Sequence, residues 1–156
     1  MAEIENNSKE TRFKVSGWLL ILCINLILVN PLWQIINQLN FYTILDSMEL
    51  FDAVEGLETL FYITLIYNAI LMFYSVKAGL GLANIKAGAV VAAKKFLRNY
   101  AIYFVMLFPL TSVISPAYFD LCIDELTSST IKSLVIIGII YAYLSLSKKV
   151  KAIYPV

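Results

Sequence analysis

Side-chain amides and hydroxyls stand in two apolar stretches of the sequence and are its best candidates for a functional site. The segment NLILVNPLWQIINQLN, residues 25–40, contains Asn30 and Gln34 one helical turn apart, so on an α-helix they share a face. The second stretch carries a polar stripe at helical spacing, formed by Thr64, Asn68 and Ser75. Such groups either exchange hydrogen bonds between helices or line a path for a polar solute.

Both interpretations of these five residues are open at the level of the sequence. Interhelical hydrogen bonds in membranes contribute on average about 0.6 kcal/mol and are the ordinary role of such side chains. The alternative is a polar pathway or ligand pocket between the two stretches. We favour hydrogen bonding, since no ionisable residue occurs in the middle of an apolar stretch, whereas ion and proton routes commonly use one.

Pro31 predicts an irregularity in the first stretch. It has no N–H to donate to the carbonyl of Ile27, so the helix should kink, and Asn30 is placed to help the freed carbonyl. Counting about 1.5 Å per residue from Ser16 leaves Asn25 and Asn30 inside the membrane, on different faces. The same count places three later amides near the outer headgroups: Gln34, Asn37 and Gln38.

Enzyme chemistry has little support in the sequence. There is no histidine, and the two cysteines are Cys23, in an apolar stretch, and Cys122, in a polar segment expected to be a loop. The usual zinc and copper ligand sets cannot be assembled from these residues. No G-x-S-x-G or Walker lysine motif is present either. We therefore expect a non-enzymatic protein without metal or cofactor, with both cysteines as free thiols.

The composition is that of a membrane protein. Of 156 residues, 60% are hydrophobic and 15% charged, against roughly 45–50% and about 25% in soluble domains. Four stretches are long enough to span a bilayer, and the lack of water in lipid requires each to be helical. The expected fold class is all-α: one domain, residues 1–156, forming an integral membrane four-helix bundle with short amphipathic surface helices. The spans are expected at about residues 16–37, 57–76, 100–118 and 131–147.

Charged residues segregate to opposite sides of these spans. All basic residues except Lys132 flank one side, beginning with Lys9, Arg12 and Lys14 before the first span. The loops on the other side are acidic. Since cytoplasmic loops are enriched in Lys and Arg, both termini are expected in the cytoplasm.

Two segments beside the spans are predicted to be amphipathic helices on the membrane surface. Residues 46–58 carry an acid at every third position and are expected to form a solvated acidic face outside the membrane. Residues from 89 onward place apolar and basic side chains on opposite arcs of a helix. The basic residues expected to contact anionic lipids at the inner face or a partner are Lys94, Lys95, Arg98, Lys148, Lys149 and Lys151.

The tail YLSLSKKVKAIYPV resembles the end of the domain of unknown function 2569 family, whose last span runs into a Ser-Lys-Arg-Val-Lys stretch. Here residues 147–151 read SKKVK. The opening SGWLLIL of the first span and the basic segment IKAGAVVAAKKFL are also similar to that family. The resemblance implies a multi-pass protein of the bacterial inner membrane without an assigned activity, and it supplies no catalytic residues.

Two functions fit these observations. We favour an accessory or scaffold membrane protein that acts through its helix faces or its basic inner segment, with a membrane-protein partner but no nucleic acid. The alternative is a small transport or channel subunit that uses the polar face between the first two spans. A small-residue face in the fourth span, Gly138, Ala142 and Ser145, is expected to pack within the monomer, with homodimerisation as the alternative.

Overall fold

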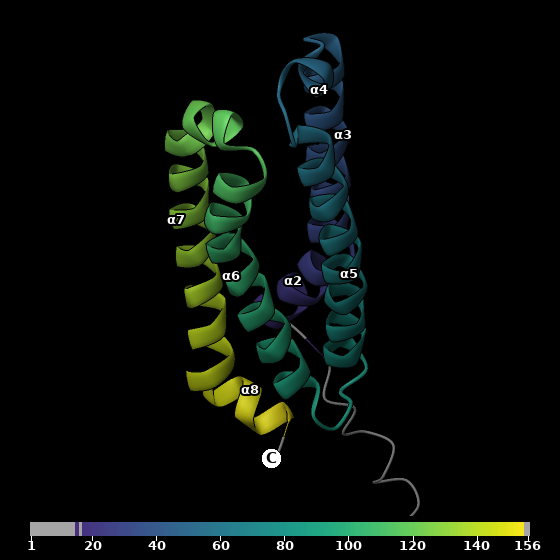
Figure 1. Cartoon of the computed structure of the whole chain (residues 1–156). Coiled ribbons are helices and arrows are strands. Elements are labelled where there is room, and N and C mark those ends of the chain that lie inside the picture. Colours follow the sequence, from purple (N-terminus) through teal and green to yellow (C-terminus); the bar gives the residue numbers. More distant parts are fainter. Residues whose placement is uncertain (1–14, 16, 155–156) are drawn as a thin grey trace, which may run out of the picture.

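The first membrane helix is interrupted by one π-helical turn. In the computed structural model, which describes residues 15 and 17–154, it comprises α2 (Trp18–Ile24), η1 (Asn25–Val29) and α3 (Asn30–Ser47) (Figure 1). We call these three elements together the first helix. Pro31 is the second residue of α3 and follows the π-helical turn directly, so its missing N–H falls inside the continuous first helix. The bend that Pro31 predicts is visible where α2 turns away from the direction of α3 (Figure 1).

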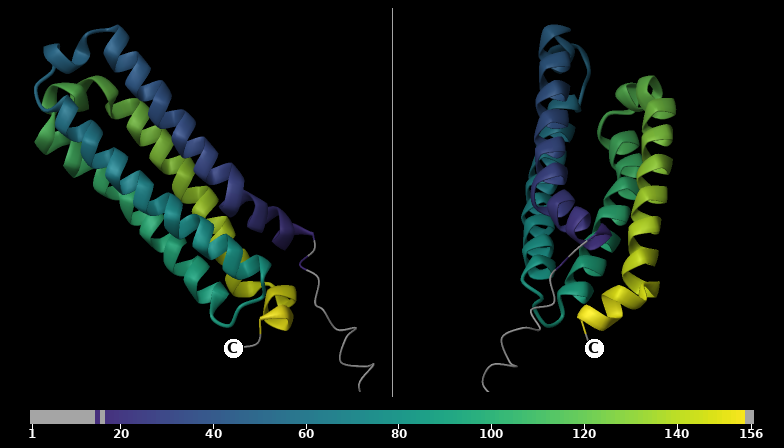
Figure 2. Two further views of the ribbon diagram at one scale, coloured as in Figure 1. Left: turned by 90° about the vertical axis from the view of Figure 1, so that its right-hand side faces the viewer. Right: turned by 180° about the vertical axis from the view of Figure 1, so that it is seen from behind.

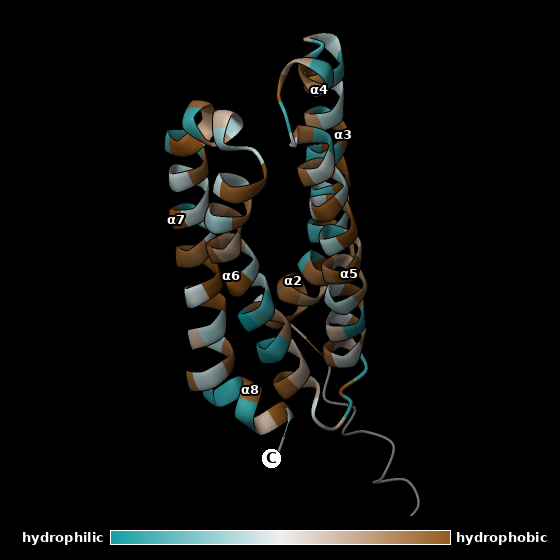
Figure 3. Ribbon diagram, viewed as in Figure 1, coloured by the Kyte–Doolittle hydropathy of each residue, from teal (hydrophilic) through white to brown (hydrophobic). Residues whose placement is uncertain are grey.

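Three further long helices complete the membrane part. They are α5 (Leu57–Ala83), α6 (Ala89–Ile114) and α7 (Pro116–Leu146). Each of the four long helices has a segment apolar enough to cross a bilayer, so the four-span, all-α prediction is confirmed. Figure 3 shows apolar residues along their whole length and hydrophilic ones in the short C-terminal helix α8 (Lys148–Ile153).

The helices extend beyond the predicted spans at several ends. The first helix continues to Ser47 instead of ending at residue 37, and α6 begins at Ala89 instead of residue 100. The loop expected between residues 118 and 131, which includes Cys122, belongs to α7. Hydropathy marks where lipid ends and not where helical hydrogen bonding ends. A 31-residue helix such as α7 is about 46 Å long, whereas the hydrocarbon core is about 30 Å thick.

The two predicted surface helices are therefore not separate elements. The basic segment from residue 89 forms the first turns of α6 itself. The acidic segment 46–58 is divided among the end of α3, the single turn α4 (Leu50–Ala53) and the start of α5. The short helices that flank the spans are α4 and α8.

The helices pack in chain order and leave the bundle open on one side. The first helix packs on α5, α5 on α6 and α6 on α7, while the backbones of α7 and the first helix approach at few points. Figures 1 and 2 show the resulting pair of α3 with α5 beside the pair of α6 with α7. We call the boundary between the first helix and α7 the open seam.

Both ends of the bundle are held by specific contacts. At the acidic end, where α4 lies, the buried Ser115 hydroxyl donates to the carbonyl of Glu55 at 2.9 Å and joins the α6–α7 turn to the start of α5. Gly56 has φ 78°, and a Cβ there would lie 1.9 Å from the carbonyl oxygen of Ile114, so only glycine fits. At the basic end, the Tyr154 hydroxyl donates to the carbonyl of Leu82 near the end of α5.

Candidate functional site

The predicted polar face brings α5 against the π-helical turn of the first helix. Ser75, which is fully buried, donates from its hydroxyl to the main-chain carbonyl of Leu26 at 2.8 Å. The Asn30 side-chain amide in turn donates to the Ser75 hydroxyl at 3.0 Å. Two of the five candidate residues therefore serve one buried hydrogen-bond relay at this crossing.

The register of the π-helical turn explains why Leu26 needs this partner. The Asn30 N–H, which would bond to Leu26 in an α-helix, bonds instead to the carbonyl of Asn25. In the π register the next donor would be Pro31, which has no N–H. The carbonyl that Ser75 serves is thus that of Leu26 and not that of Ile27, for which the sequence had suggested help.

A second interhelical bond lies closer to the acidic end. The Asn68 side-chain amide donates to the side-chain oxygen of Gln38 at 3.0 Å. Asn68 lies near the middle of α5 and Gln38 near the middle of α3, so this bond joins the central parts of the two helices. The position of Gln38 near the outer headgroups, from the count that starts at Ser16, stays a prediction. The remaining side-chain atom of Gln38, the buried Nε2, has no hydrogen-bond partner.

The other two candidate residues behave differently. The Thr64 hydroxyl donates to the carbonyl of Phe61 in its own helix at 2.9 Å. Gln34 is 6% exposed and faces the phenol of Tyr100 on α6, yet neither side-chain amide atom has a partner within hydrogen-bond geometry. A buried amide without partners destabilises a fold by about 1–3 kcal/mol. Of the five candidate residues, Gln34 is therefore the one whose buried amide is not explained by a hydrogen bond.

A cavity of about 460 Å³ lies among all four long helices in the half nearer the acidic end. We call it the seam cavity, because the first helix and α7 both line it. Its uncharged polar lining comprises Asn37 and Gln38 from α3, Thr64 from α5, Tyr103 and Thr111 from α6, and Ser129 from α7. The Asn68–Gln38 bond borders it, since Tyr103 lies beside Asn68.

The same cavity is lined by residues that the sequence had placed at the end of the third span or in the loop after it. Tyr118, Cys122 and Glu125 reach it from the first turns of α7. Glu125 is exposed, and Cys122 is half-buried and free. Sequence reasoning missed Gln38 and Glu125 as site residues because one was placed at the headgroups and the other in solvent. The i, i+3 spacing of Cys122 and Glu125 was the one available signal that they share a helix face.

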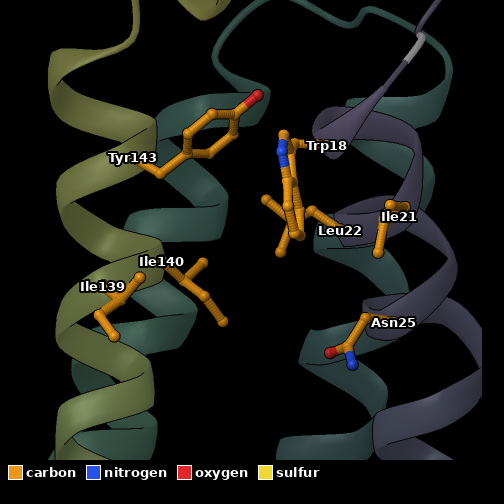
Figure 4. A pocket seen from close by; sticks show the side chains of 7 residues that line it. All are labelled: Trp18, Ile21, Leu22, Asn25, Ile139, Ile140 and Tyr143. Atoms are coloured by element: carbon orange, nitrogen blue, oxygen red, sulfur yellow. The ribbon is translucent and has the colours of Figure 1, made fainter.

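A second hollow of about 390 Å³ lies on the open seam nearer the basic end (Figure 4). Trp18, Ile21 and Leu22 of α2 face Ile139, Ile140 and Tyr143 of α7 across it. Asn25 contributes the amide at its border. The walls are otherwise apolar, so this groove suits a hydrocarbon chain better than a polar ligand.

Comparison with known proteins agrees with this architecture. A family described as "Protein of unknown function (DUF2569)" matches residues 13–155. The chain belongs to this family. Neither a curated protein nor a solved structure matches the chain.

The SKKVK stretch that carries the family resemblance folds as α8. The Ser147 hydroxyl accepts a bond from the Val150 N–H at 3.4 Å and caps the helix, while Val150 and Ile153 are buried in the core. Lys148, Lys149 and Lys151 are exposed, and the Lys149 ammonium lies close to Gly17. The buried Val150 and Ile153 thus hold α8 against the bundle, while its lysines lie on the surface.

The basic candidates on α6 have different surroundings from one another. The Lys94 ammonium lies 5.7 Å from the ring centroid of Tyr141 on α7, a cation–π distance, and Lys94 is half-buried. Lys95 and Arg98 are exposed. Lys94 therefore contributes to the α6–α7 contact, whereas the other two remain available to lipid or a partner.

The small-residue face of the fourth span does not pack within the monomer as expected. Gly138 and Ala142 are exposed, and a Cβ built on Gly138 meets nothing within 4 Å among the described residues. The Ser145 hydroxyl donates to the carbonyl of Tyr141 in its own helix at 2.8 Å. The prediction of packing within the monomer is wrong for Gly138. Homodimerisation through this face stays a prediction.

Proposed function

We propose that the protein is a non-enzymatic binding subunit that takes a small molecule into the seam cavity, as part of a transport or channel process in the bacterial inner membrane. The proposed orientation places the basic end in the cytoplasm and the opening of the cavity toward the outside. One observation carries this proposal: a cavity among the four long helices has polar groups from each of them in its lining. Its volume of about 460 Å³ lies within the range of about 300–1,000 Å³ typical of small-molecule sites.

The hydrogen bonds between the first helix and α5 refine the transport alternative. Asn30 and Ser75 are engaged with each other and with Leu26, so they do not line a path. The exposed polar groups lie further along, in the seam cavity, where Asn37 and Ser129 contribute to the lining. Binding in the seam cavity is thus better supported than conduction between the first two spans.

Native mass spectrometry of the full-length protein, released from membranes in mild detergent, tests this function. The wild-type protein is expected to retain a small molecule or lipid that Ser129→Trp loses, because Ser129 lines the cavity and tryptophan would fill it. The matched control is Ser128→Trp, on the adjacent exposed position outside the cavity lining. Equal retention by Ser129→Trp and Ser128→Trp would contradict binding in the seam cavity.

A scaffold role at the basic end is the second candidate, supported by the way α8 is held. Burial of Val150 and Ile153 fixes the helix whose exposed side chains include Lys148, Lys149 and Lys151. Each surface cation attracts anionic lipid by about 1 kcal/mol. Changing the three lysines to Gln should reduce co-purified phosphatidylglycerol and release a cross-linked partner protein. The control changes the exposed Lys77 and Lys86 of the same end, and equal losses in both variants would argue against a role specific to α8.

A further inference from the structure

The charge lining the seam cavity has one sign. Glu125 supplies a carboxylate, and no lysine or arginine occurs among the described residues that line the cavity. The carboxylate stands on α7 one turn from Cys122, in the half of the bundle nearer the acidic end. A site of this kind attracts a cation and repels an anion.

Acidic residues around the cavity strengthen this preference for cations. The α3–α5 connection and the start of α7 carry eight acids: Asp46, Glu49, Asp52, Glu55, Glu58, Asp120, Asp124 and Glu125. Lys132, near the middle of α7, does not line the cavity. Charges of one sign around an opening raise the local concentration of the opposite ion and increase its rate of association by about 10- to 1,000-fold.

Aromatic rings supply the second element of a cation site. Phe41, Tyr103 and Tyr118 line the seam cavity, and the ring centroids of Phe41 and Tyr118 are 6.0 Å apart. The faces of such rings attract ammonium groups, most strongly where water is excluded. A smaller hollow of about 210 Å³ combines the same kinds of groups. Its lining consists of four aromatic residues and two carboxylates: Tyr42, Phe51, Phe61, Tyr62, Asp52 and Glu58.

Gln38 lines the cavity, but its side-chain amide belongs to the wall: its Oε1 accepts from Asn68 and its Nε2 is buried. The described residues contain no cluster of three or more acidic, cysteine or histidine side chains that could hold a metal ion, which argues against a divalent cation as the ligand.

We propose that the seam cavity binds an organic monocation, an amine or quaternary ammonium compound with an apolar body, with its charge at Glu125 and its body against the aromatic rings. The inference rests on the proposed function and names the ligand class of the same site. Glu125 provides the charge, and Phe41, Tyr103 and Tyr118 provide the apolar and cation–π contacts.

The native Cys122 allows a direct test, because it lines the cavity. In the full chain with Cys23→Ala, reconstituted in lipid vesicles, Cys122 is treated with cationic trimethylammonioethyl or anionic sulfonatoethyl methanethiosulfonate. After correction for intrinsic reactivity, the cationic reagent should react faster by about tenfold or more. Benzyltriethylammonium should protect Cys122 from both reagents, and benzenesulfonate should not.

Two substitutions on α7 separate the cavity carboxylate from the general acidity of this end. Glu125→Gln should lower the cation-to-anion rate ratio at least about fivefold, whereas Asp124→Asn removes the same charge outside the cavity lining and should change it less than about twofold. Glu125→Asp keeps the charge and should keep most of the preference. Equal effects of the Gln and Asn variants would overturn the inference.

Failure of the inference and failure of the proposed function give different results. The neutral reagent N-ethylmaleimide should label Cys122, more slowly in Ser129→Trp than in Ser128→Trp. If it labels Cys122 in this way but the charged reagents show no preference, the cavity exists and the ligand class is wrong. If N-ethylmaleimide does not reach Cys122, or if both tryptophan variants behave alike, neither the cavity function nor its cation selectivity survives.

Discussion

The hydroxyl of Ser75 donates a 2.8 Å hydrogen bond to the main-chain carbonyl of Leu26, 49 residues earlier in the chain. The proline at position 31 and the π-helical turn before it leave that carbonyl without an N–H partner from its own helix. A defect in one helix is thus compensated by a side chain of the next. Because the Ser75 side chain is fully buried, no water can take its place without opening the contact.

The loss of stability on substitution of Ser75 should depend on whether residue 31 is proline. Ser75→Ala is expected to lower the free energy of unfolding by about 1–2 kcal/mol, because a buried carbonyl loses its donor. In a Pro31→Ala background the first helix regains an N–H, so the same substitution should be milder by at least about 0.5 kcal/mol. Unfolding by dodecyl sulfate in lipid–detergent mixtures measures all four proteins of the cycle. Additive effects would show that proline and serine are not linked.

Close packing at Gly79 should be equally sensitive. Gly79 lies one turn after Ser75, and a Cβ there would come within 2.6 Å of the Ile27 side chain and 3.0 Å of Leu26 Cβ. Gly79→Ala should therefore destabilise the protein by about 1–3 kcal/mol. Gly138→Ala is the matched control, since its Cβ would meet nothing within 4 Å. Thermal unfolding in the same detergent would contradict the prediction if the two variants were equally stable.

The sequence allowed the number and type of membrane helices to be predicted, but not their ends. A run of apolar residues reports contact with lipid, which is why all four helices were found. Charged residues such as Glu49 and Asp124 report the water boundary, yet helices cross that boundary freely when their hydrogen bonds continue. The loop assigned around Cys122 is helical for this reason, and Pro116 with Ser115 marks the true start of α7.

The candidate site could be predicted only in part from the sequence, for a related reason. Helical spacing grouped Asn30 with Gln34, and Asn68 with Ser75, but it gave no information on pairing between helices. The π-helical turn rotates the residues before Pro31 relative to those after it, so one helical wheel cannot describe the whole first helix. The seam cavity depends on which helices fail to close against each other, and this is a property of tertiary packing.

Gln34 offers a test of whether a buried polar group is retained for stability. Its two amide atoms lack hydrogen-bond partners although the side chain is 6% exposed. Gln34→Met has a similar shape without polar atoms, so it should leave the unfolding free energy unchanged or raise it by about 1 kcal/mol. Gln34→Ala is the control and should be destabilising because it leaves a cavity. A loss of stability in the Met variant equal to that in the Ala variant would show that the amide itself stabilises the fold.

The attachment of α8 should depend on pH through Tyr154. Burial, with a smaller contribution from the nearby Cys23, raises the pKa of Tyr154 from 10.0 to about 12. A raised pKa of an acid in the folded state means that stabilisation by the neutral phenol is complete below pH 10 and is lost as pH rises through about 12. Tyr154→Phe removes the donor to the Leu82 carbonyl and should destabilise the protein by about 0.5–1.5 kcal/mol near neutral pH. The difference in unfolding free energy between wild type and variant should shrink between pH 10 and pH 12. A difference that stays constant over this range would mean that the Tyr154 proton is not linked to folding.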